Sequence, residues 1–341
     1  MKILNKKKLF PLLTGLMLST LAASHTADAK PFRWQWILTG WEDLQEPDDY
    51  LDELDTKLNV LDVDFETDGD LIRAYTDKGI EVICYMSVGT YELWRDDLPK
   101  KGRMITAPLN SGVPYSVDDV LGLYDDEFFI DIGAFKLDKN RPSGYKMSYQ
   151  KHKKKDVNGL KRIMKNRIKI AANKGCDAVE FDNMDIQDVN KKKYESYKSK
   201  TKGNKTGRPS AANQAAYVLW LSEVVHSYGM DVVLKNSTSI LGYELQAKGR
   251  AKQDLTGFVN TRYIVVEECL YWKNCDRYQK IAKKNGIKVL AVEYTDLLKR
   301  RGIYTKKEAC RRLNKKSTFH ALIKDDRGLI PDGWDYYACR R

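Results

Sequence analysis

Short, almost continuous apolar runs alternate with amphipathic stretches along most of this sequence. Such runs are typical of parallel strands, which are buried on both faces, and the amphipathic stretches are typical of helices that cover a sheet. We predict strands at 34–38, 60–64, 80–87, 127–132, 178–181, 230–236, 263–268 and 287–294, with 319–323 as one further candidate. Repeated strand–helix units over 341 residues favour an α/β fold, a (β/α)8 barrel in a single domain, over an open doubly wound sheet.

The first 29 residues have the pattern of a secretory signal peptide. Lys2–Lys8 form a basic start, Leu9–Ala23 an apolar stretch, and Ala27–Ala29 a small-residue cleavage site. We therefore expect the barrel domain to occupy residues 30–341 of a protein that is secreted or periplasmic. No later stretch approaches the roughly 20 apolar residues of a membrane helix, so no membrane partner is expected after the leader is removed.

The net charge of +12 is concentrated in lysine-rich segments. Removal of the leader, with its four lysines and one aspartate, would leave +9. The excess lies at 151–155 and 191–205, the second within a basic insertion at about 190–210 that is almost free of aliphatic residues. Because the ends of the predicted strands are acidic instead, we interpret these lysines as solvated surface and expect no nucleic-acid partner.

Six cysteines follow the leader: Cys84, Cys176, Cys269, Cys275, Cys310 and Cys339. An even number in an exported protein allows up to three disulfides, in any of about fifteen connectivities. Cys269 and Cys275 are too far apart for a C-x₂₋₄-C zinc pair and no His-x₃₋₅-His follows, so we expect no metal. A buried free thiol is an alternative for Cys84, which falls within an apolar strand.

Carboxylates gather where the fifth predicted strand ends. Asp177, Glu180, Asp182 and Asp185 fall within nine residues of Gly175–Asp185. Packing does not explain them, because an unpaired buried carboxylate costs several kcal/mol to desolvate. In a barrel the C-terminal ends of the strands surround the active site, so this segment predicts catalytic acids. A solvated acidic turn or a cation-binding loop is the alternative.

Polar side chains end the other predicted strands as well. They are Asp64, Tyr85, Ser87, Asp131, Lys235, Asn236, Glu267, Glu268, Glu293 and Tyr294. These residues include the carboxylates and aromatic side chains that glycoside hydrolysis requires. The sequence has neither a His-centred triad nor a G-x-S-x-G motif. One carboxylic acid protonates the leaving oxygen while a second carboxylate attacks or activates water. The aromatic candidates for stacking on sugars are Trp36, Tyr85, Trp94, Tyr271 and Tyr294.

Several of these segments resemble motifs of glycoside hydrolase family 114, the endo-α-1,4-polygalactosaminidase family. They are Val82–Asp97, Gly175–Asp185, Leu234–Asn236, Glu267–Cys275 and Val292–Tyr294. The resemblance extends in the family's order over residues 33 to 295. Phe181 and Ile186 depart from it, since the family usually has proline and glycine there, and so does the basic insertion.

The resemblance implies a secreted (β/α)8 hydrolase that cuts α-1,4-linked galactosamine chains internally. The family's catalytic pair corresponds to Asp182, which we assign as nucleophile, and Glu267, which we assign as general acid/base. Asn183 and Lys235 would keep Asp182 ionised, whereas apolar neighbours would raise the pKa of Glu267. The predicted substrate-binding residues are Trp36, Asp64, Tyr85, Glu180, Asp185, Lys235, Asn236, Glu293 and Tyr294. We expect a monomer without cofactors that acts on a cationic amino-sugar polymer.

Other classes of function remain open from the sequence. One is a barrel that binds polysaccharide but cuts it poorly or not at all. Another is a basic exported protein that binds anionic polymers through Lys191–Lys205. A metal-dependent enzyme that uses Glu180, Asp182 and Asp185 is a weaker alternative, which a chelator would silence.

Overall fold

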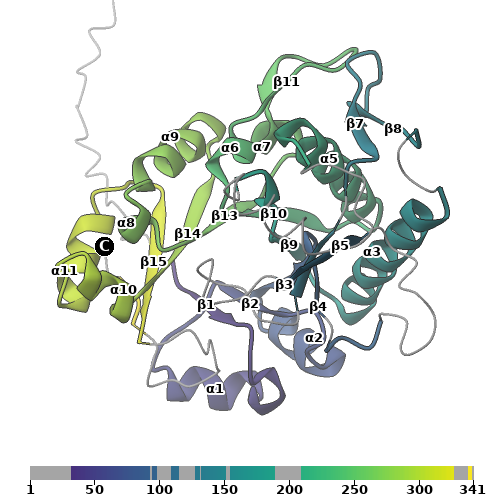
Figure 1. Cartoon of the computed structure of the whole chain (residues 1–341). Helices are drawn as coiled ribbons and strands as arrows, with labels where there is room; N and C mark the ends of the chain where they lie inside the picture. Colours follow the sequence, from purple (N-terminus) through teal and green to yellow (C-terminus); the bar gives the residue numbers. More distant parts are fainter. Residues whose placement is uncertain are drawn as a thin grey trace, which may run out of the picture. The chain divides into compact units, whose positions relative to one another are not determined.

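Eight parallel strands form the central sheet in the described part of the chain. They are β1 (Trp34–Ile37), β2 (Val60–Asp64), β3 (Glu81–Ser87), β9 (Ala178–Asp182), β10 (Asp231–Lys235), β13 (Tyr263–Glu267), β14 (Lys288–Tyr294) and β15 (Phe319–Lys324), paired in this order. Trp34 Nε1 donates to the His320 carbonyl at 3.0 Å and so links β1 to β15, the first and last strands of this order. Figure 1 shows the strands as a ring surrounded by helices, which confirms the predicted (β/α)8 barrel.

The computed structural model describes residues 32–92, 94–97, 109–114, 127–130, 132–150, 154–188, 209–325 and 337–339. Phe32–Arg341 forms one compact unit. The predicted signal peptide, most of the basic insertion and Asp131 lie outside the described residues. Within them, no helix is long and apolar enough to span a membrane.

Helices connect the strands and cover the barrel. They are α1 (Pro47–Glu53), α2 (Gly69–Asp77), α3 (Lys154–Lys174), α5 (Ala211–Ser227), α6 (Thr238–Leu241), α7 (Leu255–Phe258), α8 (Cys269–Trp272), α9 (Cys275–Asn285), α10 (Thr295–Arg300) and α11 (Lys306–Leu313). Side-chain caps fix where two of them begin. Asp68 accepts hydrogen bonds from the amides of Asp70 and Leu71 at the start of α2, and Ser210 forms a capping box with Asn213 at the start of α5.

The prediction of a barrel strand at 127–132 is wrong. There, β6 (Glu127–Ile130) lies between β4 (Thr90–Glu92) and β5 (Leu109–Pro114) in a separate antiparallel sheet. The eighth barrel strand is β15, the run we noted only as a further candidate. A short apolar run has the same pattern in both settings, because it records burial and not the strand's partner.

Alternation along each strand decides which side chains enter the barrel. On β9, Ala178 belongs to the apolar cluster inside the barrel, and Val179 and Phe181 belong to the cluster between the barrel and its helices. Successive strand residues point to opposite faces of a sheet. Glu180 and Asp182 therefore point inward with Ala178, at increasing height toward the C-terminal mouth.

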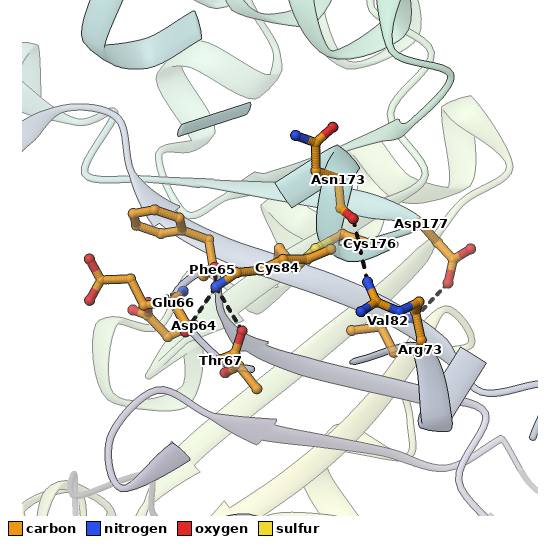
Figure 2. The surroundings of a disulfide bond; sticks show 11 residues. Asp64, Phe65, Glu66, Thr67, Arg73, Val82, Cys84, Asn173, Cys176 and Asp177 are labelled. Carbon is orange, nitrogen blue, oxygen red and sulfur yellow. Dashed lines mark hydrogen bonds between the residues drawn. A yellow bond between two sulfur atoms is a disulfide. The ribbon is translucent and has the colours of Figure 1, made fainter. Parts of the chain in front are cut away.

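Three disulfides join Cys84 to Cys176, Cys269 to Cys275 and Cys310 to Cys339. The alternative of a free thiol at Cys84 is therefore wrong. Figure 2 shows the first bridge, which fastens β3 to the turn before β9. Beside this bridge the Val82 amide donates to Asp177 Oδ2 at 2.8 Å, so the start of β9 is held to β3 by a covalent bond and a hydrogen bond.

The disulfides should differ in how much they stabilise the fold. The Cys84–Cys176 bridge closes a segment with a sequence separation of 92, whereas Cys269–Cys275 spans 6. By chain entropy, replacing the first pair with alanine should lower the free energy of unfolding by about 4.7 kcal/mol, and the second pair by about 2 kcal/mol. Urea denaturation of the two double variants measures this difference. Equal losses would contradict the loop-length argument.

Candidate active site

A buried lysine gathers three carboxylates at the mouth of the barrel. Lys235, the last residue of β10, places Nζ 3.1 Å from Asp182 Oδ2, 3.1 Å from Glu267 Oε2 and 3.4 Å from Glu180 Oε1. Its ammonium also lies 4.2 Å from the ring centroid of Trp36 and 5.3 Å from that of Tyr85. Burial alone would lower the pKa of Lys235, but Asp182, Glu267 and Glu180 raise it well above the ordinary value, so the lysine is charged.

Asp182 and Glu267 end β9 and β13, on either side of Lys235. Because Asp182 Oδ2 and Glu267 Oε2 each lie 3.1 Å from the same nitrogen, they are no more than about 6.2 Å apart. Their side chains are 15% and 24% exposed, whereas that of Lys235 is 2% exposed. Two carboxylates thus reach solvent close together, above a lysine that does not.

Glu267 is held by hydrogen bonds from three neighbouring side chains. Tyr294 OH donates to Oε1 at 2.8 Å, and Asn236 Nδ2 donates to Oε2 at 3.4 Å. Burial would raise the pKa of Glu267, but Lys235 and these hydrogen bonds, one of them from Lys235 itself, lower it below its ordinary value. The prediction that apolar neighbours raise this pKa is wrong, because a cation and a hydroxyl group adjoin the carboxylate.

The backbone after each of these strand ends is left-handed. Asn183, Asn236 and Glu268 have φ values of 59°, 49° and 60°. Asparagine tolerates this region, but for a glutamate it is uncommon, and such residues persist where the surroundings fix them. At Asn236 the side-chain oxygen accepts the amide of Glu267 at 2.9 Å, so one asparagine fastens the end of β13 to that of β10.

Gly89 lets the chain after β3 pass directly over the end of β9. The amides of Val88 and Gly89 both donate to the carbonyl of Asp182 at 3.2 Å. A Cβ atom at Gly89 would lie 1.5 Å from the carbonyl oxygen of Asn183. Only glycine permits this approach, so the backbone of the Asp182–Asn183 dipeptide depends on it.

Asp64 forms part of a second charge network outside the group around Lys235. Arg95 donates two hydrogen bonds to Asp64, at 2.9 and 2.6 Å, and pairs with Glu92 at 2.5 Å. Arg167 on α3 lies 3.8 Å from Glu92 and 2.6 Å from Asp97. Asp64 is 1% exposed, so its position provides an anchor for the segment after β3 and no contact for the predicted substrate.

Glu293 points away from the predicted cleft. It alternates with Tyr294 on β14, and Tyr294 belongs to the cluster inside the barrel. Glu293 is fully buried and accepts the amide of Leu270 at 2.8 Å, which fastens α8 to the barrel. Burial raises its pKa to about 8. With Cys269 and Cys275 it has metal-like spacing, but the two sulfurs are bonded to each other and leave no thiolate to bind a metal.

Asp185 lies just beyond β9 at the start of a polar rim. Burial, followed by the charges of Asp182 and Asp188, raises the pKa of Asp185 to about 7. Asp188 accepts hydrogen bonds from Ser237 and Ser239, at 3.1 and 2.8 Å, which ties the segment after β9 to the segment after β10. Asp185 is thus close enough to Asp182 for the two charges to interact, and its role in binding substrate stays a prediction.

Two residues of this region are not among the site residues predicted from the sequence. Asp62, which precedes Asp64 by two positions in Val-Asp-Val-Asp, also points into the barrel and is fully buried. Trp272, at the end of α8, is 49% exposed and donates to Glu268 Oε2 at 3.1 Å. Trp36, Tyr85 and Tyr294 are buried instead, so their rings are not open to a polymer.

The sequence profile of glycoside-hydrolase family GH114 matches residues 18–341. The chain belongs to this family. It is therefore a glycoside hydrolase. A search of curated proteins finds no match.

Solved structures with similarity to this chain include one that contains bound galactosamine. Aspergillus fumigatus Ega3, solved in complex with galactosamine, shares 20% identity with a TM-score of 0.57, over 90% of this GH114 chain and 94% of Ega3. An isomaltulose synthase from Klebsiella sp. LX3 shares 10% identity with a TM-score of 0.44, over 86% of this chain and 64% of the synthase. At 20% identity the likeness to Ega3 concerns the fold alone.

Gly89→Ala should inactivate the GH114 enzyme while leaving most of the barrel intact. The added methyl group must displace Asn183 and with it Asp182, the nucleophile predicted from the sequence, and misplacing a reacting group by about 1 Å can cost about 10²-fold in rate. Gly242→Ala is the matched control, because its Cβ would meet atoms only at 3.4 Å or beyond. Turnover and thermal melting of both variants test this; an active Gly89→Ala variant would show that the close approach is dispensable.

Proposed function

We propose that this GH114 enzyme is secreted and cuts an α-1,4-linked galactosamine polymer at internal bonds, with Asp182 as nucleophile and Glu267 as general acid/base. The observation that carries the proposal is the pair of carboxylates held side by side by Lys235 at the barrel mouth. The galactosamine bound to Ega3 supports an amino sugar as the substrate unit. Three disulfides support an oxidising, extracytoplasmic location, where such bonds persist.

The two carboxylates divide the reaction between them. In the first step Asp182 attacks the anomeric carbon, the glycosidic bond breaks, and its electron pair goes to the leaving oxygen, which takes a proton from Glu267. In the second step Glu267 takes a proton from water, the water oxygen attacks the same carbon, and Asp182 leaves as a carboxylate. Asp182 is neutral while the sugar is attached, so Lys235 then stabilises the Glu267 carboxylate that acts as base.

The spacing of the two carboxylates favours retention of configuration. Retaining enzymes place them about 5–5.5 Å apart, whereas inverting enzymes leave about 6.5–9.5 Å for a water molecule. The upper limit of about 6.2 Å between Asp182 Oδ2 and Glu267 Oε2 lies below the inverting range. Proton magnetic resonance of the first products should therefore show the anomeric configuration of the substrate.

Because of Lys235, the first step of the reaction should be faster at acidic pH. Glu267 must carry a proton to act as general acid, yet its pKa lies below the ordinary value because of Lys235 and its hydrogen bonds. The competent form therefore becomes more abundant as pH falls from neutrality. Activity should therefore fall as the pH rises toward neutrality, and this alkaline limb of the profile follows the loss of the proton from Glu267.

Asp182→Asn and Glu267→Gln should each abolish turnover without unfolding the protein. Both amides keep the shape of the side chain but remove the charge or proton that the reaction needs. The assay is incubation with a panel of amino-sugar polymers, followed by mass spectrometry of the oligosaccharides released. Glu244→Gln, which alters an exposed pair with Lys252, is the control.

Retention of wild-type activity by Asp182→Asn or Glu267→Gln would remove that residue from the mechanism. Binding of the polymer by the wild-type enzyme without release of oligosaccharides would instead favour the binding barrel considered from the sequence.

The charge of the mouth favours a deacetylated polymer. Asp182 and Glu267 end β9 and β13, and three further acidic residues follow these strands: Asp185, Asp188 and Glu268. Lys235, which faces Asp182 and Glu267, is itself buried. Free galactosamine units carry ammonium groups at neutral pH, and an acidic cleft attracts a cationic chain even when distant lysines make the whole protein positive.

Cleavage should therefore be faster for a deacetylated polymer than for its fully acetylated form, and this preference should weaken as salt is added. Exposed charges more than about 8–10 Å apart are largely screened at physiological ionic strength. Matched polymers at several degrees of acetylation, each assayed at two salt concentrations, provide the measurement. Equal cleavage of all forms, independent of salt, would show that cleft charge does not select the substrate.

A further inference from the structure

Two further carboxyl groups meet inside the barrel, one layer deeper than Asp182. Asp62 on β2 and Glu180 on β9 are fully buried, and their side chains are in mutual hydrogen-bond contact. Apart from each other, their four oxygens find no hydrogen-bond donor among the described residues, although the ammonium of Lys235 lies 3.4 Å from Glu180 Oε1. Ionised carboxylates only accept hydrogen bonds, so the contact requires a proton on one of the two.

The surroundings of the pair favour such a proton. Burial, followed by the charge of Glu180, raises the pKa of Asp62 well above its ordinary value. Burial likewise raises the pKa of Glu180 to about 7, against the opposing effect of Lys235. Two carboxyl groups that share a buried site cannot both ionise cheaply, as in the paired aspartates of aspartic proteases.

Lys235 connects this pair to the catalytic carboxylates. The groups around its ammonium and the pair are Trp36 on β1, Asp62 on β2, Tyr85 on β3, Glu180 and Asp182 on β9, and Glu267 on β13, which Tyr294 on β14 contacts in turn. Glu180 approaches the ammonium from below, and Asp182 and Glu267 approach it from nearer the mouth.

We propose that Asp62 and Glu180 are positioning residues: a carboxyl pair that shares one proton, carries one negative charge and fixes Lys235 between Asp182 and Glu267. The inference rests on the proposed two-carboxylate mechanism. Neither residue touches the substrate, because both are fully buried. Their effect on the reaction passes through Lys235, whose charge sets how readily Glu267 holds a proton.

The direction of that effect follows from charge. Glu180 attracts Lys235 and repels a negative charge on Glu267. In Glu180→Gln the single charge of the pair passes to Asp62, away from the oxygen that lies 3.4 Å from Lys235, so Lys235 interacts more strongly with Glu267 and the repulsion from Glu180 is gone. Both changes lower the pKa of Glu267 and make its acid form scarcer at any given pH.

Glu180→Gln tests this through the pH profile. The alkaline limb of kcat/KM should move to lower pH by about one unit, the low end of the range for loss of a neighbouring charge. The value of kcat near neutrality should fall, and KM should change little because Glu180 is out of reach of the polymer. Glu244→Gln again serves as the control and should leave both the limb and kcat unchanged.

Comparison of Asp62→Ala with Asp62→Asn distinguishes the loss of the shared proton from a packing defect. Alanine removes the donor and leaves Glu180 ionised in a buried site, so kcat should fall about 10²-fold as Lys235 shifts. The amide of asparagine can donate to Glu180 as the proton does, so Asp62→Asn should recover most of that loss. Thermal melting of both variants shows whether each is folded at the assay temperature.

Infrared difference spectroscopy tests the pair without any substrate. At neutral pH the wild type should show the carbonyl stretch of a protonated carboxyl group that disappears in Asp62→Asn. Because this readout needs no turnover, it stands even if the enzyme proves to cut a different polymer. Absence of that band overturns the proposal. A wild-type kcat and pH profile in Asp62→Ala, or a raised KM with unchanged kcat in Glu180→Gln, also overturns it.

Discussion

The attraction between one buried ammonium and the carboxylates around it determines the rest of this active site. Lys235 lies within 3.4 Å of Glu180, Asp182 and Glu267. None of these charges would be stable in the barrel alone, since burying an unpaired ion costs several kcal/mol. Each therefore depends on the others, and their common position fixes the distance between the two carboxylates that reach solvent.

Hydrogen bonds and a disulfide fix the backbone around this group of charges. Asn236 links the ends of β10 and β13, and the amides of Val88 and Gly89 hold the carbonyl of Asp182. The Cys269–Cys275 disulfide closes the segment directly after Glu267 and Glu268. A site whose backbone is fixed in this way keeps its reacting groups within the narrow tolerance that catalysis requires.

A separate charge network stabilises the neighbouring wall of the barrel. Arg95 joins β2 to the segment after β3 through Asp64 and Glu92, and Arg167 joins that segment to α3. These buried ions are paired with good geometry, so removing one partner would leave the other uncompensated. The described part of the barrel thus contains two polar clusters that look alike in the sequence but differ in position: one holds the scaffold, and the other surrounds the carboxylates that we propose as catalytic.

The sequence by itself determined the barrel and which residues are candidates for its site. Apolar runs ended by Asp182, Lys235 and Glu267 place these residues at strand ends, and parallel strands end on the same side of a barrel. Only the tertiary structure decided that Glu293 points outward and Tyr294 inward. Strand alternation shows that two neighbouring residues point to opposite faces of the sheet, but not which of them points into the barrel. The tertiary structure also decided which side chains contact one another inside the barrel. The contact of Asp62 with Glu180 and the lowered pKa of Glu267 depend on distances across the barrel, which no local pattern of residues encodes.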